Sequence, residues 1–270
     1  MTGIDLEQII RDRKPGLARW MPRFAMNYIK RTVHADWIND VLRRFGHLSG
    51  APFVEAVLDD MQVTRIVEGA ENVDPSRRYI FASNHPLGGL DGLAIAAGFF
   101  KIFGDTRLIV NDLLMNLDPL RPLFVPVNKY GKQSADYART HDELYRSDAR
   151  IVVFPAGFCS RKIHGKIQDI PWKKNFISKA IEYGRDVVPV YVDARNSDFF
   201  YNLSNFRKRL RLPNIELFWL PDEFYRQHGR TIRITIGQPV AYTRFKGEMN
   251  RDAWAQTLRE MAYSLKCSND

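Results

Sequence analysis

His85 and Asp91 are the pair of residues in this chain best suited to chemistry. They lie six positions apart in the stretch SNHPLGGLDG, which follows a short apolar run. A carboxylate beside an imidazole orients the ring and stabilises its charged form, so the other ring nitrogen can take a proton from a hydroxyl group. The glycines between them permit a tight turn that would bring the carboxylate back to the ring. The pair predicts general-base chemistry on a hydroxyl, with no nucleophile from the protein.

A strand and a helix must position this pair. The β-rich run Tyr79–Ala82 precedes His85, and Asp91 stands where a helix predicted over Gly92–Phe100 would begin. Active sites in α/β sheets commonly lie where strands end. The alternative is a structural histidine in a turn beside an aspartate that only caps a helix. The double glycine at a strand end favours the chemical role.

From residue 62 onward, short β-rich runs alternate with helical segments, a pattern typical of a sheet with helical crossovers. The predicted strands are Val63–Val67, Tyr79–Ala82, Leu108–Val110, Phe124–Asn128, Ile151–Phe154, Val187–Val192, Ile215–Phe218 and Ile232–Ile236. The predicted helices are Gly92–Phe100, Ser134–Tyr145, Trp172–Tyr183, Phe200–Leu210 and Asp252–Leu265. We expect an α/β fold with a mixed, mainly parallel sheet flanked by helices. Its active site should lie at the sheet edge between the turns that carry His85 and Gly157.

Residues 1–60 have a helical pattern, which predicts a helical N-terminal region ahead of a catalytic domain over residues 61–270. An apolar stripe recurs at three- and four-residue spacing, at Leu17, Trp20, Met21, Phe24 and Tyr28. Basic residues alternate with it, at Arg11, Arg13, Lys14, Arg19, Arg23, Lys30 and Arg31. Such a helix suits an anionic membrane interface. It could equally pack its stripe on the main domain and leave its basic face in water.

Composition narrows the function classes. The 270 residues are 45% hydrophobic and 26% charged, an ordinary globular balance, and the formal net charge is +9. That charge attracts polyanions, which could be nucleic acid, anionic lipid or a phosphorylated substrate. Two cysteines are too few for a disulfide framework. The N-terminal stretch MTGIDLEQIIRDRKPG has no apolar core of signal-peptide length, and the longest apolar run is too short to span a bilayer. We therefore expect a cytoplasmic protein that lies on any membrane it meets.

The stretch SNHPLGGLDG resembles the Asn-His-(four residues)-Asp motif of the glycerolipid acyltransferase superfamily, whose best-known members acylate 1-acylglycerol-3-phosphate. Here five residues separate the histidine from the aspartate. That spacing is similar to a haemolysin-like branch of ornithine- or glycine-lipid O-acyltransferases. The resemblance implies that His85 and Asp91 are catalytic and that Asn84, Gly88 and Gly89 contact the substrate.

A second stretch, VVFPAGFCSRK, resembles the family's Phe-Pro-Glu-Gly block, which precedes a serine and binds the acceptor's phosphate or glycerol. The substrate-binding residues that this resemblance implies are Phe154, Pro155, Gly157, Ser160, Arg161 and Lys162. Two basic side chains suit a carboxylate or phosphate on the acceptor, although they could also form a solvated loop. Ala156 stands where the family has glutamate, which indicates a headgroup other than glycerol phosphate.

Two weaker blocks complete the resemblance. The stretch LFVPVNKYG is similar to the family's second block and implies that Lys129 supplies its cationic group. The stretch VVPVYVDARNS is similar to the fourth block, with Pro189 in an apolar strand and Arg195 and Asn196 near the mouth of the site.

Other chemistries have less support from the residues. Cys159 could form an acyl-enzyme, but the resemblance assigns direct attack by the acceptor. A Gly-x-Ser-x-Gly nucleophile elbow is absent, and no two of the six histidines have the helical spacing of a zinc site. We expect no metal. The rival from another class is a non-enzymatic basic module for nucleic acid or lipid, which clusters such as Arg207-Lys208-Arg209 and Lys173-Lys174 favour.

The resemblance implies O-acyl transfer from acyl-CoA or acyl carrier protein, as co-substrate and with no other cofactor, onto the hydroxyl of a lysolipid. The acceptor is lysophosphatidate or a mono-acylated amino-acid lipid of the ornithine or glycine type, with the Ala156 replacement favouring the latter. The expected partners are the acceptor, the donor and an anionic membrane surface at the inner face of the cell membrane. Nucleic acid is not expected as a partner.

Overall fold

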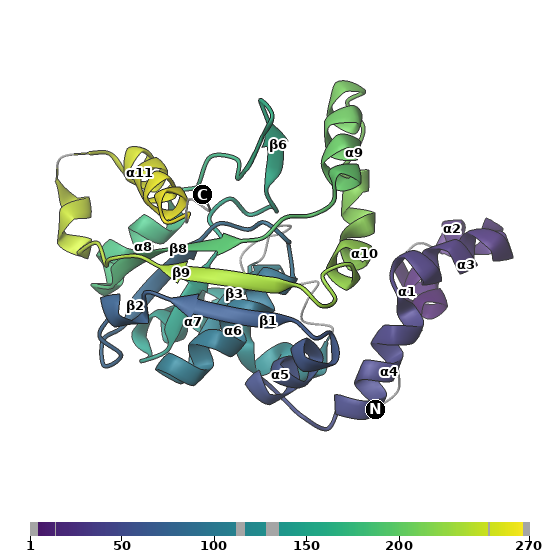
Figure 1. The fold of residues 1–270 in the computed structure, drawn as a ribbon, viewed down its shortest axis with the longest axis horizontal. Coiled ribbons are helices and arrows are strands. Elements are labelled where there is room, and N and C mark those ends of the chain that lie inside the picture. Colours follow the sequence, from purple (N-terminus) through teal and green to yellow (C-terminus); the bar gives the residue numbers. More distant parts are fainter. Residues whose placement is uncertain (1–4, 14, 112–116, 128–134, 248, 267–270) are drawn as a thin grey trace.

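The computed structural model describes residues 5–13, 15–111, 117–127, 135–247 and 249–266. Its centre is a seven-stranded sheet in the order β1-β9-β8-β2-β5-β3-β4 (Figure 1). The strands are β1 (Thr64–Glu68), β2 (Tyr79–Ser83), β3 (Thr106–Asn111), β4 (Phe124–Val127), β5 (Arg150–Val153), β8 (Asp186–Asp193) and β9 (Thr231–Ile236). All neighbours pair in parallel except β8 and β9, which are antiparallel. The expected mixed, mainly parallel sheet is confirmed.

Helices cover both faces of this sheet. The α-helices are α1 (Leu6–Arg13), α2 (Pro15–Trp20), α3 (Arg23–Thr32), α4 (Ala35–Phe45), α5 (Ala51–Asp60), α6 (Leu90–Phe103), α7 (Ala135–Arg146), α8 (Asn175–Tyr183), α9 (Asp198–Arg209), α10 (Leu220–Tyr225) and α11 (Arg251–Ser264). Short 3-10 helices are η1 (Ala70–Asn72), η3 (Asp118–Leu123), η4 (Ile215–Trp219) and η5 (Tyr242–Lys246). In Figure 1, α5 and α6 lie on one side of the sheet, and α8 and α11 on the other.

The central strands are buried because both of their faces pack against helices, as in other parallel sheets. Along β2, Phe81 joins the core that includes α5 and α6, whereas Ile80 and Ala82 join the core that includes α8 and α11. Strand β9 differs, since its isoleucines are buried and its intervening residues are not. The apolar runs that predicted these strands therefore match strands with two covered faces.

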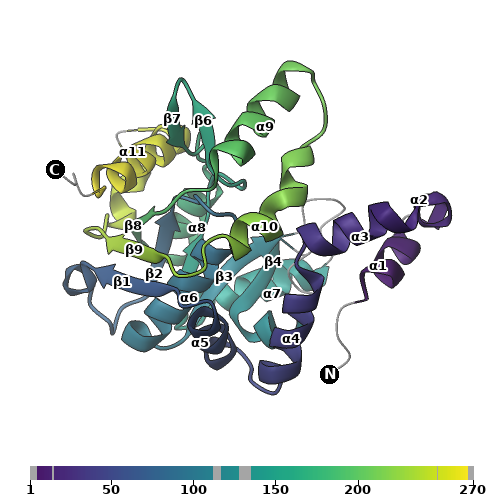
Figure 2. The ribbon, with the colours of Figure 1, turned by 45° about the vertical axis from the view of Figure 1, so that its right-hand side comes forward.

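The N-terminal region is helical, as expected, and its parts differ in packing. Phe53 and Leu58 of α5 belong to the same core as α6 and the sheet. Helices α1 to α3 instead project away from the sheet (Figures 1 and 2). The division at residue 60 into a separate region and domain stays a prediction.

One predicted strand is wrong. Residues Ile215–Phe218 lie in η4, a 3-10 helix, and not in the sheet. The side chain of Glu216 in this segment is fully buried and bonds to Arg161 and Arg207. Apolar content alone predicted a strand, but it gives no sign of these ion pairs, one of which joins Glu216 to a residue 55 positions away.

A two-stranded hairpin was not predicted. Strands β6 (Arg161–Ile163) and β7 (Lys166–Gln168) pair antiparallel around His164 and Gly165. Both turn residues have positive φ, 48° and 77°, the geometry of a type I′ turn. The strands are only three residues each, too short for an alternating pattern to be visible in the sequence.

Candidate active site

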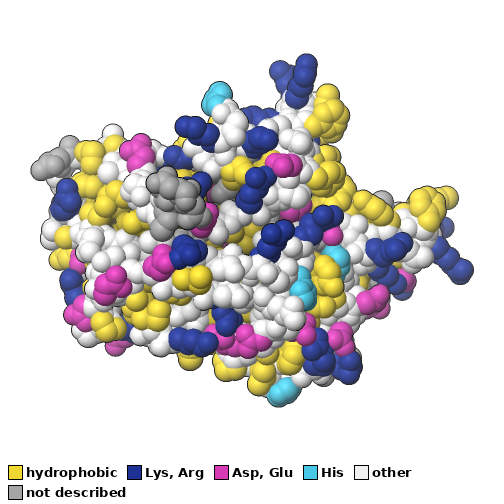
Figure 3. All heavy atoms as spheres, in the orientation of Figure 1, with side chains coloured by type: hydrophobic (Ala, Val, Ile, Leu, Met, Phe, Trp, Pro, Cys, Tyr) yellow, Lys and Arg dark blue, Asp and Glu magenta, His cyan; other side chains and the backbone are white. Residues whose placement is uncertain are grey.

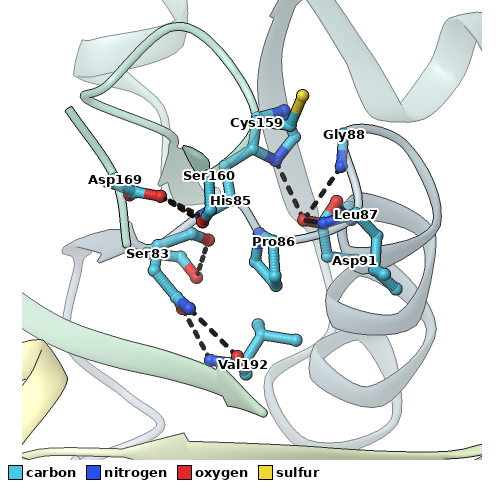
Figure 4. Close-up of polar contacts among 12 residues, drawn as sticks. Ser83, His85, Pro86, Leu87, Gly88, Asp91, Cys159, Ser160, Asp169 and Val192 are labelled. Carbon is cyan, nitrogen blue, oxygen red and sulfur yellow. Dashed lines mark hydrogen bonds and ion pairs between the residues drawn. The ribbon is translucent and has the colours of Figure 1, made fainter. Parts of the chain in front are cut away.

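The turn after β2 brings His85 and Asp91 together. Strand β2 ends at Ser83, and α6 begins at Leu90, so Asp91 lies in the first turn of that helix. Between them, Gly88 has a φ of +81°, a conformation that L side chains rarely adopt. The chain therefore folds back, and the carboxylate meets the imidazole across the turn (Figure 4).

The two side chains form a close pair. His85 Nδ1 lies 3.0 Å from Asp91 Oδ2. The same Oδ2 accepts a hydrogen bond from the Leu87 amide at 2.9 Å, and Oδ1 accepts one from the Gly92 amide at 2.8 Å. The Asp91 side chain is fully buried, while that of His85 is 16% exposed. One partner is thus fixed inside the protein and the other can meet a substrate.

The environment keeps Asp91 ionised. Burial would raise the pKa of this carboxyl, but the nearby His85 charge and the hydrogen bonds from His85, Leu87 and Gly92 lower the pKa below its ordinary value. An ionised carboxylate at Nδ1 selects the tautomer that leaves Nε2 as the basic nitrogen. The ring is further held by Phe154, which stacks on it with centroids 4.1 Å apart.

The Phe154 turn follows β5, the parallel neighbour of β2. Because parallel strands end at the same side of a sheet, the two turns predicted from the sequence are adjacent. Gly157 has a φ of +70° in this turn. The amide of Ser160 donates to the His85 carbonyl at 2.8 Å, which joins the turns directly. The site lies at the ends of central strands, not beside an outer strand.

Asp169 is a site residue that the sequence did not reveal. Its side chain is fully buried, and Oδ1 accepts hydrogen bonds from the Ser160 hydroxyl at 2.6 Å and the His85 amide at 3.3 Å. Oδ2 accepts one from the Trp172 indole at 2.9 Å. Burial raises the pKa of Asp169 despite these bonds. The stretch KIQDIPW has no motif, so only the fold places this carboxyl at the histidine backbone.

Several predicted substrate residues have other partners. Both polar atoms of the buried Asn84 amide bond to the Val192 backbone, so this side chain joins β2 to β8. The buried Ser160 hydroxyl is engaged by Asp169. The side-chain amide of Asn196 donates to the carbonyl of Pro86 at 3.2 Å, next to His85. These side chains therefore fix the backbone around the His85 turn.

The predicted cations differ in availability. Arg161 is buried and pairs with Glu216 at 3.0 Å, and Arg207 bonds to the same carboxylate at 3.1 Å. Arg161 is therefore already engaged by an acid. Lys162 is half-buried, with no carboxylate partner in the part of the chain that the structure describes. Lys129 lies outside the described residues.

The remaining predicted residues lie in the two turns, in the sheet and near the surface. Pro155 accepts from the Lys173 amide through its carbonyl at 3.1 Å, and Ala156 is fully buried. A Cβ on Gly89 would lie 3.7 Å from the Phe224 ring. Pro189 pairs in register with Ala82 inside the sheet, and Arg195 pairs with Asp198 near the surface.

Cys159 is poorly suited to form an acyl-enzyme. The side chain is buried, and this burial raises the pKa of the thiol to about 11. Nucleophilic attack requires the thiolate, which is a minor form at neutral pH with such a pKa. Within residues that the structure describes, no three His, Cys, Asp or Glu side chains gather as a metal site. In the same residues, no helix has the length and apolarity to cross a bilayer.

Comparisons with known proteins also indicate an acyltransferase. A family model described as "Acyltransferase" matches residues 8–270. Two relatives named "Lyso-glycine lipid O-acyltransferase", from Bacteroides thetaiotaomicron and Phocaeicola vulgatus, are each 40% identical over 264 residues. These matches cover 97% of this chain, and 97% and 95% of the respective relatives.

Among solved structures, the chain is similar to the 1-acyl-sn-glycerophosphate (LPA) acyltransferase PlsC from Thermotoga maritima. The TM-score is 0.48 at 19% sequence identity, over 90% of this chain and 94% of that one. The family match and the two relatives confirm the resemblance found in the sequence motifs. With a family model that spans nearly its whole length, the chain belongs to the acyltransferase family and is an acyltransferase enzyme.

Proposed function

We propose that this enzyme transfers a fatty acyl chain from acyl-CoA or acyl carrier protein to the hydroxyl of a lyso-glycine lipid. The observation that carries the proposal is the 3.0 Å contact between His85 Nδ1 and the buried Asp91 carboxylate. The acceptor follows from the two relatives named for it, at 40% identity over nearly the whole chain. The buried Ala156 agrees, because it supplies no carboxylate to an acceptor's glycerol.

The proposed reaction is direct attack by the acceptor. The acceptor oxygen forms a bond to the thioester carbonyl carbon while its proton moves to His85 Nε2. Asp91 stabilises the resulting imidazolium through Nδ1. The carbon–sulfur bond then breaks, and the leaving thiolate takes the proton from Nε2. The scheme balances without a covalent enzyme intermediate, a metal ion or another cofactor.

A cation beside the Gly157 turn is suited to the glycine carboxylate of the acceptor. The Lys173 ammonium lies 3.8 Å from the place where a Cβ on Gly157 would stand. In the part of the chain that the structure describes, no carboxylate pairs with this lysine. In the sequence, Lys173 was notable only as part of the basic cluster Lys173-Lys174. We assign it to headgroup binding in place of the engaged Arg161.

Replacing Lys173 tests this assignment against a neighbour of the same type. Lys173→Met should raise the KM for lyso-glycine lipid about tenfold, as expected for loss of a charged hydrogen bond. Lys174→Met is the matched control, because Lys174 pairs with Asp252 at 2.7 Å. Equal KM values for the two variants would contradict the headgroup role.

We also propose that the enzyme works at the inner face of the cell membrane, where a water-soluble donor meets a lipid acceptor. Trp20, Phe24 and Tyr28 of the N-terminal stripe are 82%, 76% and 54% exposed. The exposure of Trp20 and Phe24 disfavours the alternative in which the whole stripe packs on the main domain, whereas Tyr28 contacts the ring of Phe218 there. Aromatic and basic side chains on one helix suit an anionic interface.

Direct acyl transfer tests the proposed function. Purified enzyme should acylate lyso-glycine lipid from acyl-CoA or acyl carrier protein, with a kcat/KM higher than for lysophosphatidate. The product is identified by mass spectrometry after each donor is offered separately. A preference for lysophosphatidate would overturn the acceptor assignment, and activity with neither acceptor would overturn the proposal.

A further inference from the structure

A second part of the molecule presents apolar side chains to solvent. From α9 to the start of η4, five large apolar residues are 38% to 59% exposed: Phe199, Phe206, Leu210, Leu212 and Ile215. Exposed apolar residues are unexceptional when scattered, but contiguous groups mark interaction surfaces. In the described residues, nine of the twelve exposed large apolar side chains lie here or in α1 to α3. We call residues 206–215 the α9 tip.

The α9 tip is basic as well as apolar. It contains Arg207, Lys208, Arg209 and Arg211, with no acidic residue. Arg207 pairs with Glu216, whereas no described acid pairs with Lys208, Arg209 or Arg211. Many other cations of this protein are in ion pairs, so this group is available to an external anion. Figure 3 shows Lys and Arg side chains beside hydrophobic ones at the top of the molecule.

The base of α9 packs on the catalytic turns. Phe200 and Tyr201 are fully buried and share a cluster with Cys159, in the turn that follows β5. A Cβ on Gly88, in the histidine turn, would lie 3.2 Å from Leu220 at the start of α10. The α9 tip therefore stands on elements that contact the active site.

The N-terminal helices join the same side of the molecule. Tyr28 of α3 stacks on Phe218 of η4 with ring centroids 6.3 Å apart. His34, just after α3, lies 2.9 Å from the Asp222 carboxylate of α10. Figures 1 and 2 both show α9 and α3 as two projections on the α10 side of the sheet.

We propose that the α9 tip is a second membrane-docking element, which inserts into an anionic bilayer surface together with the N-terminal helices. The acceptor would then pass from the bilayer to His85 between two lipid-bound projections. This inference deepens the proposed function, since the ligand is the membrane that holds the acceptor. It adds a binding surface, centred on Phe206 and Leu210, that the N-terminal stripe does not include.

An anionic bilayer fits this surface better than a protein or a nucleic acid partner. Unpaired cations suit lipid phosphate and carboxylate groups, and each contributes on the order of 1 kcal/mol near an anionic surface. The exposed phenyl and leucyl groups would gain from burial at the acyl boundary. A nucleic acid would use the cations and leave Leu210 and Leu212 in water.

Charge reversal with a matched control tests the proposal. Lys208→Glu with Arg209→Glu should lower partitioning onto vesicles of phosphatidylglycerol and phosphatidylcholine by about tenfold or more, without ligand present. Arg244→Glu with Lys246→Glu changes the net charge equally on η5, at the opposite end of the sheet (Figure 1). This control should bind like wild type. For the apolar part, Phe206→Ala should weaken binding, whereas Phe100→Ala on α6 should not.

An environment-sensitive dye locates the contact independently. Attached at Leu210→Cys in a Cys267→Ser background, the dye should shift to the blue with these vesicles, while the buried Cys159 stays unlabelled. Equal partitioning of the two charge-reversed proteins, with no spectral shift, would overturn the inference. Self-association that Phe206→Ala abolishes in sedimentation would overturn it in favour of a second copy.

The two proposals fail separately. Vesicle binding is measured without acyl donor, so it does not depend on catalysis. Acyl transfer to acceptor dispersed in detergent micelles does not require docking. If vesicle binding is absent while acyl transfer in micelles is observed, the proposed function stands without the docking surface. If vesicle binding is observed while acyl transfer is absent, the docking surface stands without the proposed function.

Discussion

The buried carboxylate of Asp91 is the most constrained group of the active site. It accepts bonds from the His85 ring and from the amides of Leu87, Gly88 and Gly92. Together with the charge on the imidazole, these bonds outweigh burial and lower its pKa. A carboxylate with fixed donors cannot rotate away, so it holds the imidazole in one orientation.

Removing either member of the pair should abolish most activity. We expect His85→Ala to lower kcat by about 10²- to 10⁴-fold, since the general base is lost, and Asp91→Asn to lower it severely. Steady-state kinetics and thermal unfolding of each purified variant check this. The backbone donors to Asp91 remain in His85→Ala, so the fold should persist. Retention of more than about a tenth of wild-type kcat in that variant would contradict the mechanism.

The same pair predicts a pH dependence of stability. Because folding lowers the pKa of Asp91, its stabilising contribution is fully present above the ordinary value of 3.8. It is lost as pH falls through the lower folded pKa. The difference in unfolding free energy between wild type and Asp91→Asn should thus shrink as the pH falls below about 4. Urea unfolding at pH values below about 4 measures it, and a difference that grows as the pH falls within that acid range would refute the assignment.

We propose that Asp169 is a positioning residue, which acts on His85 through the backbone amide. Its raised pKa means that ionisation of this buried carboxyl costs stability, a penalty absent below its ordinary 3.8 and complete above the raised value. The energetic cost suggests a role other than stability. With Ser160, this carboxyl holds both the amide and the carbonyl of His85.

Asp169→Asn separates positioning from binding. An amide there can accept at only one atom, so a bond to Ser160 or Trp172 is lost and the His85 backbone can shift. We expect kcat to fall about tenfold, because small displacements of a catalytic group are costly. The acceptor KM should stay within about twofold, unlike that of Lys173→Met. Loss of stability with unchanged kcat would indicate a purely structural role.

At the scale of elements, the turn between β2 and α6 decides the geometry. Gly88 has positive φ, and a Cβ there would lie 3.3 Å from the Cβ of Cys159. Two glycine-bearing turns thus pack against each other where parallel strands end. A side chain at this position would therefore be crowded, and its neighbours would have to shift to accommodate it.

Gly88→Ala should damage activity and stability together. We expect a loss of about 1–2 kcal/mol of unfolding free energy from backbone strain. The crowding should also displace the His85 turn and lower kcat. Gly104→Ala is the matched control, since Gly104 has a φ of +74° with no atoms near its missing Cβ. It should lose similar stability and keep full kcat; equal kcat losses in both would contradict this account.

At the scale of the whole molecule, the N-terminal helices extend the enzyme beyond its α/β body. Arg19 and Arg23 are exposed beside Trp20 and Phe24, whereas Lys30 pairs with Glu7 at 2.6 Å. Arg19 and Arg23 have no acidic partner among the residues that the structure describes, so they are the better probes of an electrostatic contact with lipid.

Arg19→Glu with Arg23→Glu should weaken docking on anionic vesicles about tenfold, since each cation contributes on the order of 1 kcal/mol. Binding to zwitterionic vesicles should change little, and salt should reduce the difference between variants. Co-sedimentation measures both, with Arg244→Glu and Lys246→Glu as the equal-charge control. If the N-terminal variant binds like this control, the segment does not dock.

The close pairing of His85 with Asp91 and the elements around it could be predicted from the sequence, because both are local. A strand, a glycine turn and a helix start lie within about a dozen residues, and hydrogen bonds along the chain bring His85 to Asp91. The apolar runs of β2 and β8 predicted buried strands because parallel sheets are covered on both faces. The family resemblance rested on the same short segments, and the family match and the two relatives confirmed it.

The sequence could not show which polar groups are already engaged, because their partners come from distant parts of the chain. Asp169 lies 84 residues from His85 in sequence, and Glu216 lies 55 from Arg161, so no local pattern indicates either contact. Glu216 lies in a 3-10 helix where a strand was predicted, and its carboxylate bonds to Arg161, a predicted substrate cation. The exposure of Trp20, Phe24 and the α9 tip could not be predicted either, because an apolar helix face has the same sequence pattern whether it packs on a core or on a membrane. Burial and ion pairing depend on what the rest of the chain places alongside, and that is a property of the fold.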